Sequence, residues 1–431
     1  MFQFRFRFLC LIITAHCLAL PAWAVDYSLS GFGTLGYALS NKPYSYQRFV
    51  SQEGTFRRDS VAGIQLDARF TERLGATVQV LAAPATDSDV KTEASVAWAF
   101  LSLRPTNDWL FRAGKQRIPL YLFSQNYNLG VTYPFARLPT EMYSISPSNE
   151  FTGLSASKTW ETSGGDLTLD GYWGVSDLDV RFWIRDGIPA VQAPGPLFRR
   201  IGVEGGGLVL SYRRQENVVR IGIGKVNVDE KNSSNAYPVT YPFVSLFPGI
   251  GYYQVNAALP GPGIPTIDKY GYRTFTLGAD LDIGSGFRAM GEFARSYVSD
   301  TLFSTQSNRG YVAILRPINK WTPYISYAFL RSEASVLLLQ KLVNNTSIPV
   351  FVPGAAQINA AQRVGADSLL AFDQRSLAIG TSYSLSATSK LKAELMRVRI
   401  GQVSSLVDAP PGSNIRNQNI NVISLSYSVV F

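Results

Sequence analysis

Residues 109–143 read WLFRAGKQRIPLYLFSQNYNLGVTYPFARLPTEMY, and the change of character after the ninth residue decides the fold. The first nine residues alternate in a way that suits one wall of a β-sheet. Beyond them, Pro119, Gly130, Pro134 and Pro139 prevent regular structure over most of the segment. The segment is nevertheless rich in tyrosine and phenylalanine, which are unlikely to hang freely in water. We therefore interpret it as a loop folded inside a container, and the rest of the chain indicates that the container is a barrel.

The chain opens with a pattern typical of a secretory signal peptide. Arg5 and Arg7 precede a short apolar run at residues 9–20, which ends in the A-x-A sequence of residues 22–24. We expect residues 1–24 to be removed by cleavage after Ala24. The apolar run is short for a membrane anchor, which needs about 20 residues.

Composition excludes several classes of function once this leader is removed. Both cysteines and the one histidine, Cys10, Cys17 and His16, lie within it, so residues 25–431 contain neither residue type. Disulfides, thiolate nucleophiles, histidine metal ligands and histidine-based triads are thereby excluded. We expect no catalytic residues, no metal and no cofactor, and we do not expect an enzyme.

Charge argues against nucleic acid as a partner. Of the 40 lysines and arginines, Arg5 and Arg7 lie in the leader, which leaves 38 basic residues against 31 acidic ones. The resulting net charge of +7 is not gathered into a basic tract of the kind that binds nucleic acid.

No run of 18 or more apolar residues follows the leader, so helical membrane spans are excluded and a closed β-barrel is the remaining way to cross a membrane. A secreted soluble protein of two or three domains is the competing class. Alternation favours the barrel because it recurs to the last residue: at 63–70 and at 274–281, apolar residues alternate with polar or small ones. In a sandwich the apolar face would form the core, whereas in a membrane barrel it meets lipid and the polar face lines water, and the connection lengths decide between the two.

The connections between these alternating segments fall into two length classes that follow one another along the chain. Tight-turn sequences occur at residues 71–74, 105–108, 162–165, 214–217, 283–286, 317–320 and 386–389. Long segments lie at about 40–57, 83–93, 116–151, 176–206, 227–271, 297–308, 330–374 and 402–418. Seven turns and eight loops require 16 strands, an arrangement typical of outer-membrane barrels. The sequence therefore predicts an all-β, 16-stranded antiparallel transmembrane barrel over residues 25–431, with an inward-folded third loop at about 116–151.

The last strand, residues 420–431, has one strongly apolar face. Ile423, Leu425, Tyr427, Val429 and Phe431 share that face, and the chain ends on the phenylalanine. This strand resembles the C-terminal strand of Gram-negative outer-membrane proteins, which the barrel assembly machinery is thought to read. The resemblance assigns Tyr427 and Phe431 to the assembly signal.

The leader, the barrel pattern and a charged motif together resemble the Gram-negative trimeric porins. The motif is Arg112-Ala113-Gly114-Lys115-x-Arg117-x-Pro119 followed by Tyr133-Pro134-Phe135-Ala136-Arg137-x-Pro139-x-Glu141, and it is similar to that of a proteobacterial porin branch. The resemblance implies a homotrimer in the bacterial outer membrane, in contact with lipid and lipopolysaccharide, whose third loop narrows each pore. General porins usually carry several acids on that loop, whereas this chain has only Glu141 and Glu150 there, so a cation preference is not expected.

The predicted function is a porin for passive diffusion of small hydrophilic solutes and ions, with a weak preference for anions. The chemistry of a pore depends on its width and lining charge rather than on a reacting group. Strand parity directs these charged residues inward: Asp67, Arg69, Arg112, Arg220, Asp280, Arg288 and Glu292. The motif adds Lys115, Arg117, Arg137 and Glu141 to the predicted constriction. Arginine remains charged in such a lumen and would attract anions.

Two of the long loops are unusually apolar, at residues 237–267 and 333–372. In the second, Val336, Leu339, Gln340 and Val343 have helical spacing. These loops either pack over the barrel mouth or against a neighbouring subunit, or they form a hydrophobic vestibule. The second interpretation predicts a substrate-specific channel for a hydrophobic or aromatic compound.

Overall fold

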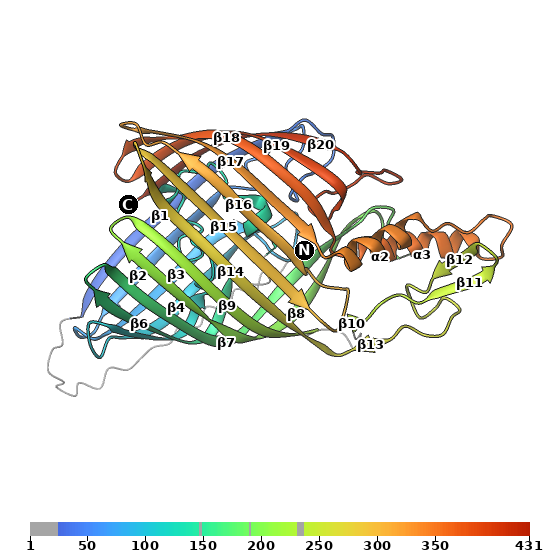
Figure 1. Ribbon diagram of the computed structural model, residues 1–431, viewed down its shortest axis with the longest axis horizontal. Helices are drawn as coiled ribbons and strands as arrows, with labels where there is room; N and C mark the ends of the chain where they lie inside the picture. The colour runs from blue at the N-terminus through green and yellow to red at the C-terminus, as the bar shows by residue number, and fades with distance from the viewer. Residues whose placement is uncertain (1–24, 146–148, 189–190, 231–236) are drawn as a thin grey trace, which may run out of the picture.

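The computed structural model describes residues 25–145, 149–188, 191–230 and 237–431, so the expected leader and its cleavage site after Ala24 lie outside the described residues. Sixteen antiparallel strands form one closed barrel in which β1 pairs with β20, as predicted (Figure 1). The first eight are β1 Asp26–Ser40, β2 Val61–Arg69, β3 Leu74–Pro84, β4 Thr92–Leu103, β5 Trp109–Arg117, β6 Glu150–Thr162, β7 Gly165–Ile184 and β8 Gly195–Arg214. The others are β9 Asn217–Glu230, β14 Lys269–Gly284, β15 Phe287–Val298, β16 Ser307–Leu315, β17 Trp321–Ser332, β18 Phe372–Ser386, β19 Ser389–Ser404 and β20 Asn419–Val430.

Alternation along the strands separates an apolar outer face from the barrel interior. In β20, Leu425 and Tyr427 are exposed while Ser424, Ser426 and Ser428 are buried inside. Closure matters because the hydrocarbon core of a membrane offers no partner for an unpaired backbone group, and the β1–β20 pairing leaves no free edge.

Short turns join the strands at one end of the barrel and the long loops lie at the other, as the sequence predicted. We number the loops L1 to L8; they occupy residues 41–60, 85–91, 118–149, 185–194, 231–268, 299–306, 333–371 and 405–418. The predicted fourth loop, 176–206, is shorter in the structure because β7 and β8 remain paired up to Ile184 and Gly195. These two strands form a hairpin that is long for the barrel.

L5 and L7 carry secondary structure of their own and project beyond the barrel (Figure 1). L5 contains β10 Tyr237–Pro238, β11 Phe243–Phe247, β12 Ile250–Tyr253 and β13 Thr266–Ile267, and L7 contains α2 Ala334–Asn345 and α3 Ala355–Asp367. The helical spacing predicted at 336–343 is confirmed, since Val336, Leu339 and Val343 are buried along α2. Gln362 of α3 bonds both backbone groups of Tyr253, which ties L7 to L5. Within the described ranges, no helix is long and apolar enough to cross a membrane.

L3 lies inside the barrel, where it forms part of a large buried cluster. It contains two short helices, η1 Gly130–Thr132 and α1 Thr140–Tyr143. Phe123, Phe135 and Met142 of L3 pack against inward residues of β15, β16 and β17. The inward-folded third loop predicted from the sequence is therefore present, and it positions the candidate site.

Candidate functional site

L3 spans the interior from one wall to the other. Near its start, Leu120 lies against Gly222 of β9. In its middle, Leu129 packs with Phe32 and Trp98 of β1 and β4, and η1 contacts β19 and β20. Near its end, α1 returns to contact β15, β16 and β17. L3 thus divides the barrel into two chambers.

Glu292 of β15 attaches L3 to the wall. Its Oε2 accepts a hydrogen bond from the Leu122 N–H at 2.8 Å, and its Oε1 accepts from the Tyr143 hydroxyl and from the Tyr311 hydroxyl, the latter at 3.1 Å. A buried carboxylate costs much free energy unless such donors satisfy it. Predicted as a lining charge, Glu292 does point inward, and its oxygens are bonded to L3 and to β16.

A second attachment lies on β17 and β19. The Tyr324 hydroxyl donates to Glu394 at 2.8 Å and accepts from the Ala136 N–H of L3 at 3.0 Å. The Lys392 ammonium donates to the carbonyl oxygens of Gly130 and Phe135 and lies 4.1 Å from the centre of the Tyr133 ring. The backbone of L3 is therefore held by groups from β17 and β19, the two strands on either side of β18.

Arg137 and Glu141 complete the attachment of L3 on the side of L1 and β18. Arg137 forms an ion pair with Asp59 at 2.9 Å and a hydrogen bond with Gln47, both in L1. Glu141 Oε1 accepts from Gln374 at 2.8 Å. Burial raises the pKa of the Glu141 carboxyl, because the charged form is poorly solvated there.

The other two motif residues are also bonded within the chain. Arg117 is buried, donates to the Gln125 carbonyl of L3 at 3.5 Å and stacks near the Trp98 ring. Lys115 forms an ion pair with Glu150 at 3.0 Å and is in register with the exposed Thr152, on the face opposite the buried Gln116. The structure therefore brings Arg117, Arg137 and Glu141 together through L3 and places Lys115 on the outward face of β5.

Arg112 and Arg220 lie on the inner wall beneath L3. Arg220 donates to the Tyr121 carbonyl at 2.6 Å and to the Ser211 hydroxyl at 3.1 Å, and Arg112 stacks 5.2 Å from the Phe100 ring. Asp170 attracts both guanidinium groups. Among the described residues neither arginine has a carboxylate within ion-pair distance. The two arginines and Asp170 together carry a net positive charge, and Glu292, whose oxygens are bonded to L3 and β16, also attracts Arg220.

A polar chamber of about 690 Å³ lies at the turn end, and we call it the turn-end chamber. Its lining includes Asp26, Asp67, Arg69, Arg73, Thr77, Ser102 and Arg104. Asp67 accepts hydrogen bonds from Gln65 at 2.7 Å and Thr77 at 2.6 Å. Elsewhere on this part of the wall, Arg288 pairs with Asp280 at 2.8 Å and with Glu216 at 3.0 Å.

A narrow cavity of about 50 Å³ lies between L3 and the wall formed by β7, β9 and β14, and we call it the neck. Its lining contains five tyrosines and no charged residue: Tyr121, Tyr127, Tyr143, Tyr172 and Tyr272, with Leu120, Gly224 and Thr274 among the others. Gly224 leaves the wall bare here, and a Cβ at that position would lie 3.4 Å from the Tyr172 hydroxyl, an ordinary contact.

A larger cavity of about 840 Å³ lies beyond L3, among the long loops, and we call it the loop-end chamber. Tyr272 lines both this chamber and the neck. Its aromatic lining is Phe182, Tyr237, Tyr241, Tyr270, Tyr272, Phe303 and Phe372. The inner wall adds Leu178, Val180, Ile201 and Val228, so the chamber is apolar where the turn-end chamber is polar.

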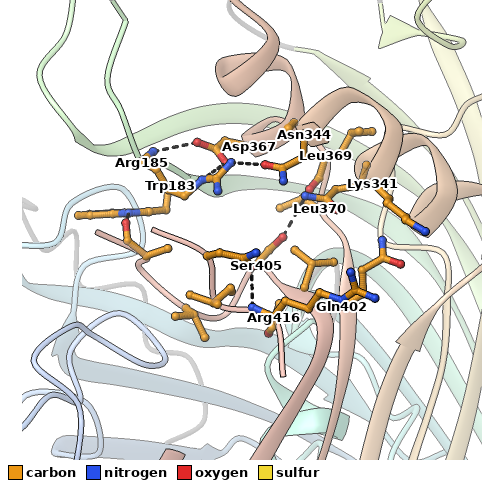
Figure 2. Close-up of a pocket in the computed structure, with 18 of the residues that line it drawn as sticks. Trp183, Arg185, Lys341, Asn344, Asp367, Leu369, Leu370, Gln402, Ser405 and Arg416 are labelled. Atoms are coloured by element: carbon orange, nitrogen blue, oxygen red, sulfur yellow. Dashed lines mark hydrogen bonds and ion pairs between the residues drawn. The ribbon is translucent and has the colours of Figure 1, made fainter. Parts of the chain in front are cut away.

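The tip of the β7–β8 hairpin is bonded to three other loops. Arg181 forms ion pairs with Asp89 of L2 at 2.7 Å and with Asp408 of L8 at 2.8 Å. Arg185 binds Asp367 of α3 and Asn344 of α2, each at 2.7 Å (Figure 2). Burial raises the pKa of Asp367 to about 6. The hairpin tip thus forms one side of the loop-end chamber and is fastened by charges.

Comparison with known proteins supports the fold. No protein-family model matches the chain, and no curated protein matches its sequence. OmpT, an outer-membrane protein of Vibrio cholerae, is similar in structure with a TM-score of 0.50 and 13% identity, over 96% of this chain and 99% of that one. An anion-selective porin from Comamonas acidovorans has a TM-score of 0.50 and 11% identity, over 94% of this chain and 100% of that one. OprB of Pseudomonas putida has the same score and identity over 94% of each chain. The fold is that of outer-membrane porins.

Sequence reasoning missed the neck tyrosines and the two attachments through Glu394 and Lys392. The tyrosines of L3 gave a signal, because the loop is rich in aromatic residues, but their partner Tyr172 comes from a strand 29 residues beyond Tyr143. Gly222 and Gly224, in the sequence IGIG, leave the inward face of β9 without side chains at these two positions. An alternating glycine pattern of this kind on an inward face could have indicated a close approach.

Proposed function

We propose that this protein is an outer-membrane channel through which small hydrophilic solutes and ions diffuse passively, with a weak preference for anions. The observation that carries the proposal is a closed barrel with a chamber on each side of L3 and, beneath L3, two arginines that form no ion pair with any described residue. Width and lining charge are what a pore needs, so no enzymatic role is proposed.

The anion preference rests on the wall group of Arg112, Arg220 and Asp170. Guanidinium groups remain charged at any pH at which the protein works, and a low-dielectric wall extends their field into the lumen. The anion-selective porin from Comamonas acidovorans shares this fold, which makes the preference compatible with the architecture. The field of two arginines against one aspartate is modest, and the expected preference is correspondingly weak.

The proposal includes an assembly and a location. In-vitro folded OmpT of Vibrio cholerae is described in a trimer form, and we propose a homotrimer here as well. Outer-membrane lipid and lipopolysaccharide would surround the apolar outer face. Phe431 pairs through its backbone with Gly31 at 2.9 Å while its side chain stays exposed. We propose that Phe431 and Tyr427 are read by the barrel assembly machinery.

Conductance of the refolded protein in planar bilayers tests the proposal. A salt gradient should give a reversal potential on the anion side, and Arg220→Glu combined with Arg112→Glu should move it toward cations. Lys225→Glu is the matched control, since Lys225 is exposed on the same strand with the opposite parity, and we expect no shift. A cation-selective parent protein, or an equal shift in the control, would contradict the assignment. Conductance steps in groups of three would support the trimer.

A second candidate is a substrate-specific channel for a hydrophobic or aromatic compound. The apolar lining of the loop-end chamber is the observation that favours it. Liposome swelling distinguishes the two: rapid entry of sugars supports the general channel, whereas exclusion of sugars with entry of small aromatic compounds supports the specific one.

A further inference from the structure

The wall of the loop-end chamber differs from the usual lumen of a membrane barrel. A barrel that encloses water has polar inward residues. Here the inward residues Leu178 and Val180 of β7, Ile201 of β8 and Val228 of β9 are apolar and adjacent to one another. A volume of about 840 Å³ lies within the range of small-molecule sites, roughly 300–1,000 Å³, which are mostly apolar with a few placed polar groups.

Aromatic rings in this chamber are held in fixed orientations by one another. Tyr237 and Tyr270 meet edge to face with centroids 4.8 Å apart, and Tyr241 and Phe303 do the same at 4.7 Å. Tyr272 is held at its hydroxyl by Thr305 at 3.3 Å. Fixed rings lose little side-chain entropy when a ligand arrives, and they favour another ring in offset or edge-to-face contact.

The charges around the chamber balance. Arg48 and Arg181 line it, and each is paired with an acid: Arg48 with Asp89 at 2.7 Å and Arg181 with Asp89 and Asp408. The remaining charged lining residues, Arg199 and Asp179, contribute one charge of each sign. A charged ligand would lose its hydration among apolar side chains without a surplus of opposite charge to offset that loss.

The chamber wall contains a buried hydroxyl group that has no hydrogen-bond partner in the described part of the chain. Ser304 is 3% exposed, lines the chamber, and its hydroxyl makes no hydrogen bond with a described residue. A buried hydroxyl left without a partner is costly, and a ligand group that bonds it would recover that cost.

We propose that the loop-end chamber is a binding site for an uncharged aromatic compound that carries one hydrogen-bonding group, with Ser304 as the partner of that group. The proposal deepens the aromatic-channel candidate and rests on it for the entry and exit of the ligand. Binding itself needs only the chamber, and it can be measured without conduction.

Titration of the full refolded protein in lipid nanodiscs with 2-naphthol tests the site, with empty nanodiscs as the blank. We expect saturable binding at pH 7 that is at least about tenfold tighter than that of 2-naphthoate, because the carboxylate must be desolvated. Ile201→Gln should weaken 2-naphthol binding about tenfold by placing an amide in the apolar wall. Arg200→Gln, at the adjacent and exposed position on the opposite face of β8, should leave it unchanged.

Ser304→Ala separates the hydrogen bond from the apolar contact. It should weaken 2-naphthol about threefold to tenfold and leave naphthalene binding unaltered. Tighter binding of 2-naphthoate, no saturable binding, or equal effects of Ile201→Gln and Arg200→Gln would overturn the proposal. Conductance without 2-naphthol binding would refute the binding site and support the proposed channel. Binding without conductance would support the binding site and refute the channel.

Discussion

The two chambers on either side of L3 have opposite chemistry and are lined by different strands, the turn-end chamber by β1 to β4 and the loop-end chamber mainly by β7, β8, β9 and β14. β9 places Arg220 under L3 and Val228 in the loop-end chamber, both pointing inward. At the turn end the wall is polar, as expected of a barrel that encloses water. At the loop end the apolar wall is covered by L5, L6 and L7, so its water contact is limited. Alternation along a strand therefore decides which residues face inward, while the loops that cover the barrel end decide whether an inward residue can be apolar.

The largest expected effect comes from obstructing the neck, which we expect to be the passage between the two chambers. Gly224→Phe places a ring in the neck, where a Cβ fits but a larger group meets Tyr172. We expect single-channel conductance to fall by about tenfold or more, because the obstructed section dominates the resistance.

Gly271→Phe is the control for the neck variant. Gly271 lies on the neighbouring strand β14 between two inward tyrosines, so its own position faces outward, and nothing lies within 4 Å of a Cβ there. The single-channel conductance of Gly271→Phe should equal that of the parent protein. If Gly224→Phe conducts normally, ions pass L3 at another point and the neck does not connect the chambers.

The next effect concerns the loop that separates the chambers. Glu292→Ala leaves the Leu122 N–H and the Tyr143 hydroxyl without their acceptor, and we expect the free energy of unfolding in urea to fall by about 2 kcal/mol. Conductance should become larger and noisier, because L3 is loosened. Arg295→Ala on the same strand breaks an exposed 3.5 Å ion pair with Glu333 and should cost about 0.5 kcal/mol or less. Equal losses in the two variants would show that Glu292 does not hold L3.

The smallest effect concerns pH at the hairpin tip. The pKa of Asp367 is about 6 when the tip is closed on α3, and it returns toward its ordinary value of 3.8 if the tip opens and the carboxylate is hydrated. The closed form therefore binds the proton more tightly, so lowering the pH from 7 to 5 favours closure, and above pH 6 the dependence disappears.

Hydrogen–deuterium exchange measures this closure. After correction for the intrinsic rate, exchange of the Arg185 amide, which donates to Asp367 at 2.9 Å, should slow a few-fold between pH 7 and pH 5. Asp367→Asn should remove the dependence. The same pH response in that variant would assign it to another group.

Much of the fold could be predicted because its determinants are local. A strand with one face in lipid must alternate apolar and polar residues, and a two-residue or four-residue turn can be recognised from its own residue types. The number and order of the strands therefore followed from counting turns and loops. The interior position of L3 also followed, since prolines and aromatic residues in one segment exclude both a strand and free exposure. The fourth loop was predicted too long because Arg181 interrupts the apolar alternation of β7, although the ladder continues past it to Ile184.

The roles of the charged residues depended on partners distant in sequence. Strand parity places both Glu292 and Arg112 on the inward face. Glu292 is nevertheless bonded to L3, whereas Arg112 lies on the wall beneath L3. Residues 292 and 122 are 170 positions apart, and nothing near either one specifies the contact. Parity places Lys115 on the outward face with Phe111 and Ala113, but the motif assigned it to the constriction, and the structure agrees with the parity.

By itself the sequence determined a closed 16-stranded barrel, the inward third loop and the absence of cysteine and histidine from residues 25–431. These properties depend on composition and on short-range periodicity, which a linear chain carries in full. Only the tertiary structure decided that the interior has a polar chamber, an apolar chamber and a tyrosine-lined neck beside the apolar one. The reason is physical: a chamber is the space left between segments far apart in sequence, and its chemistry is the sum of faces that meet only when the barrel closes.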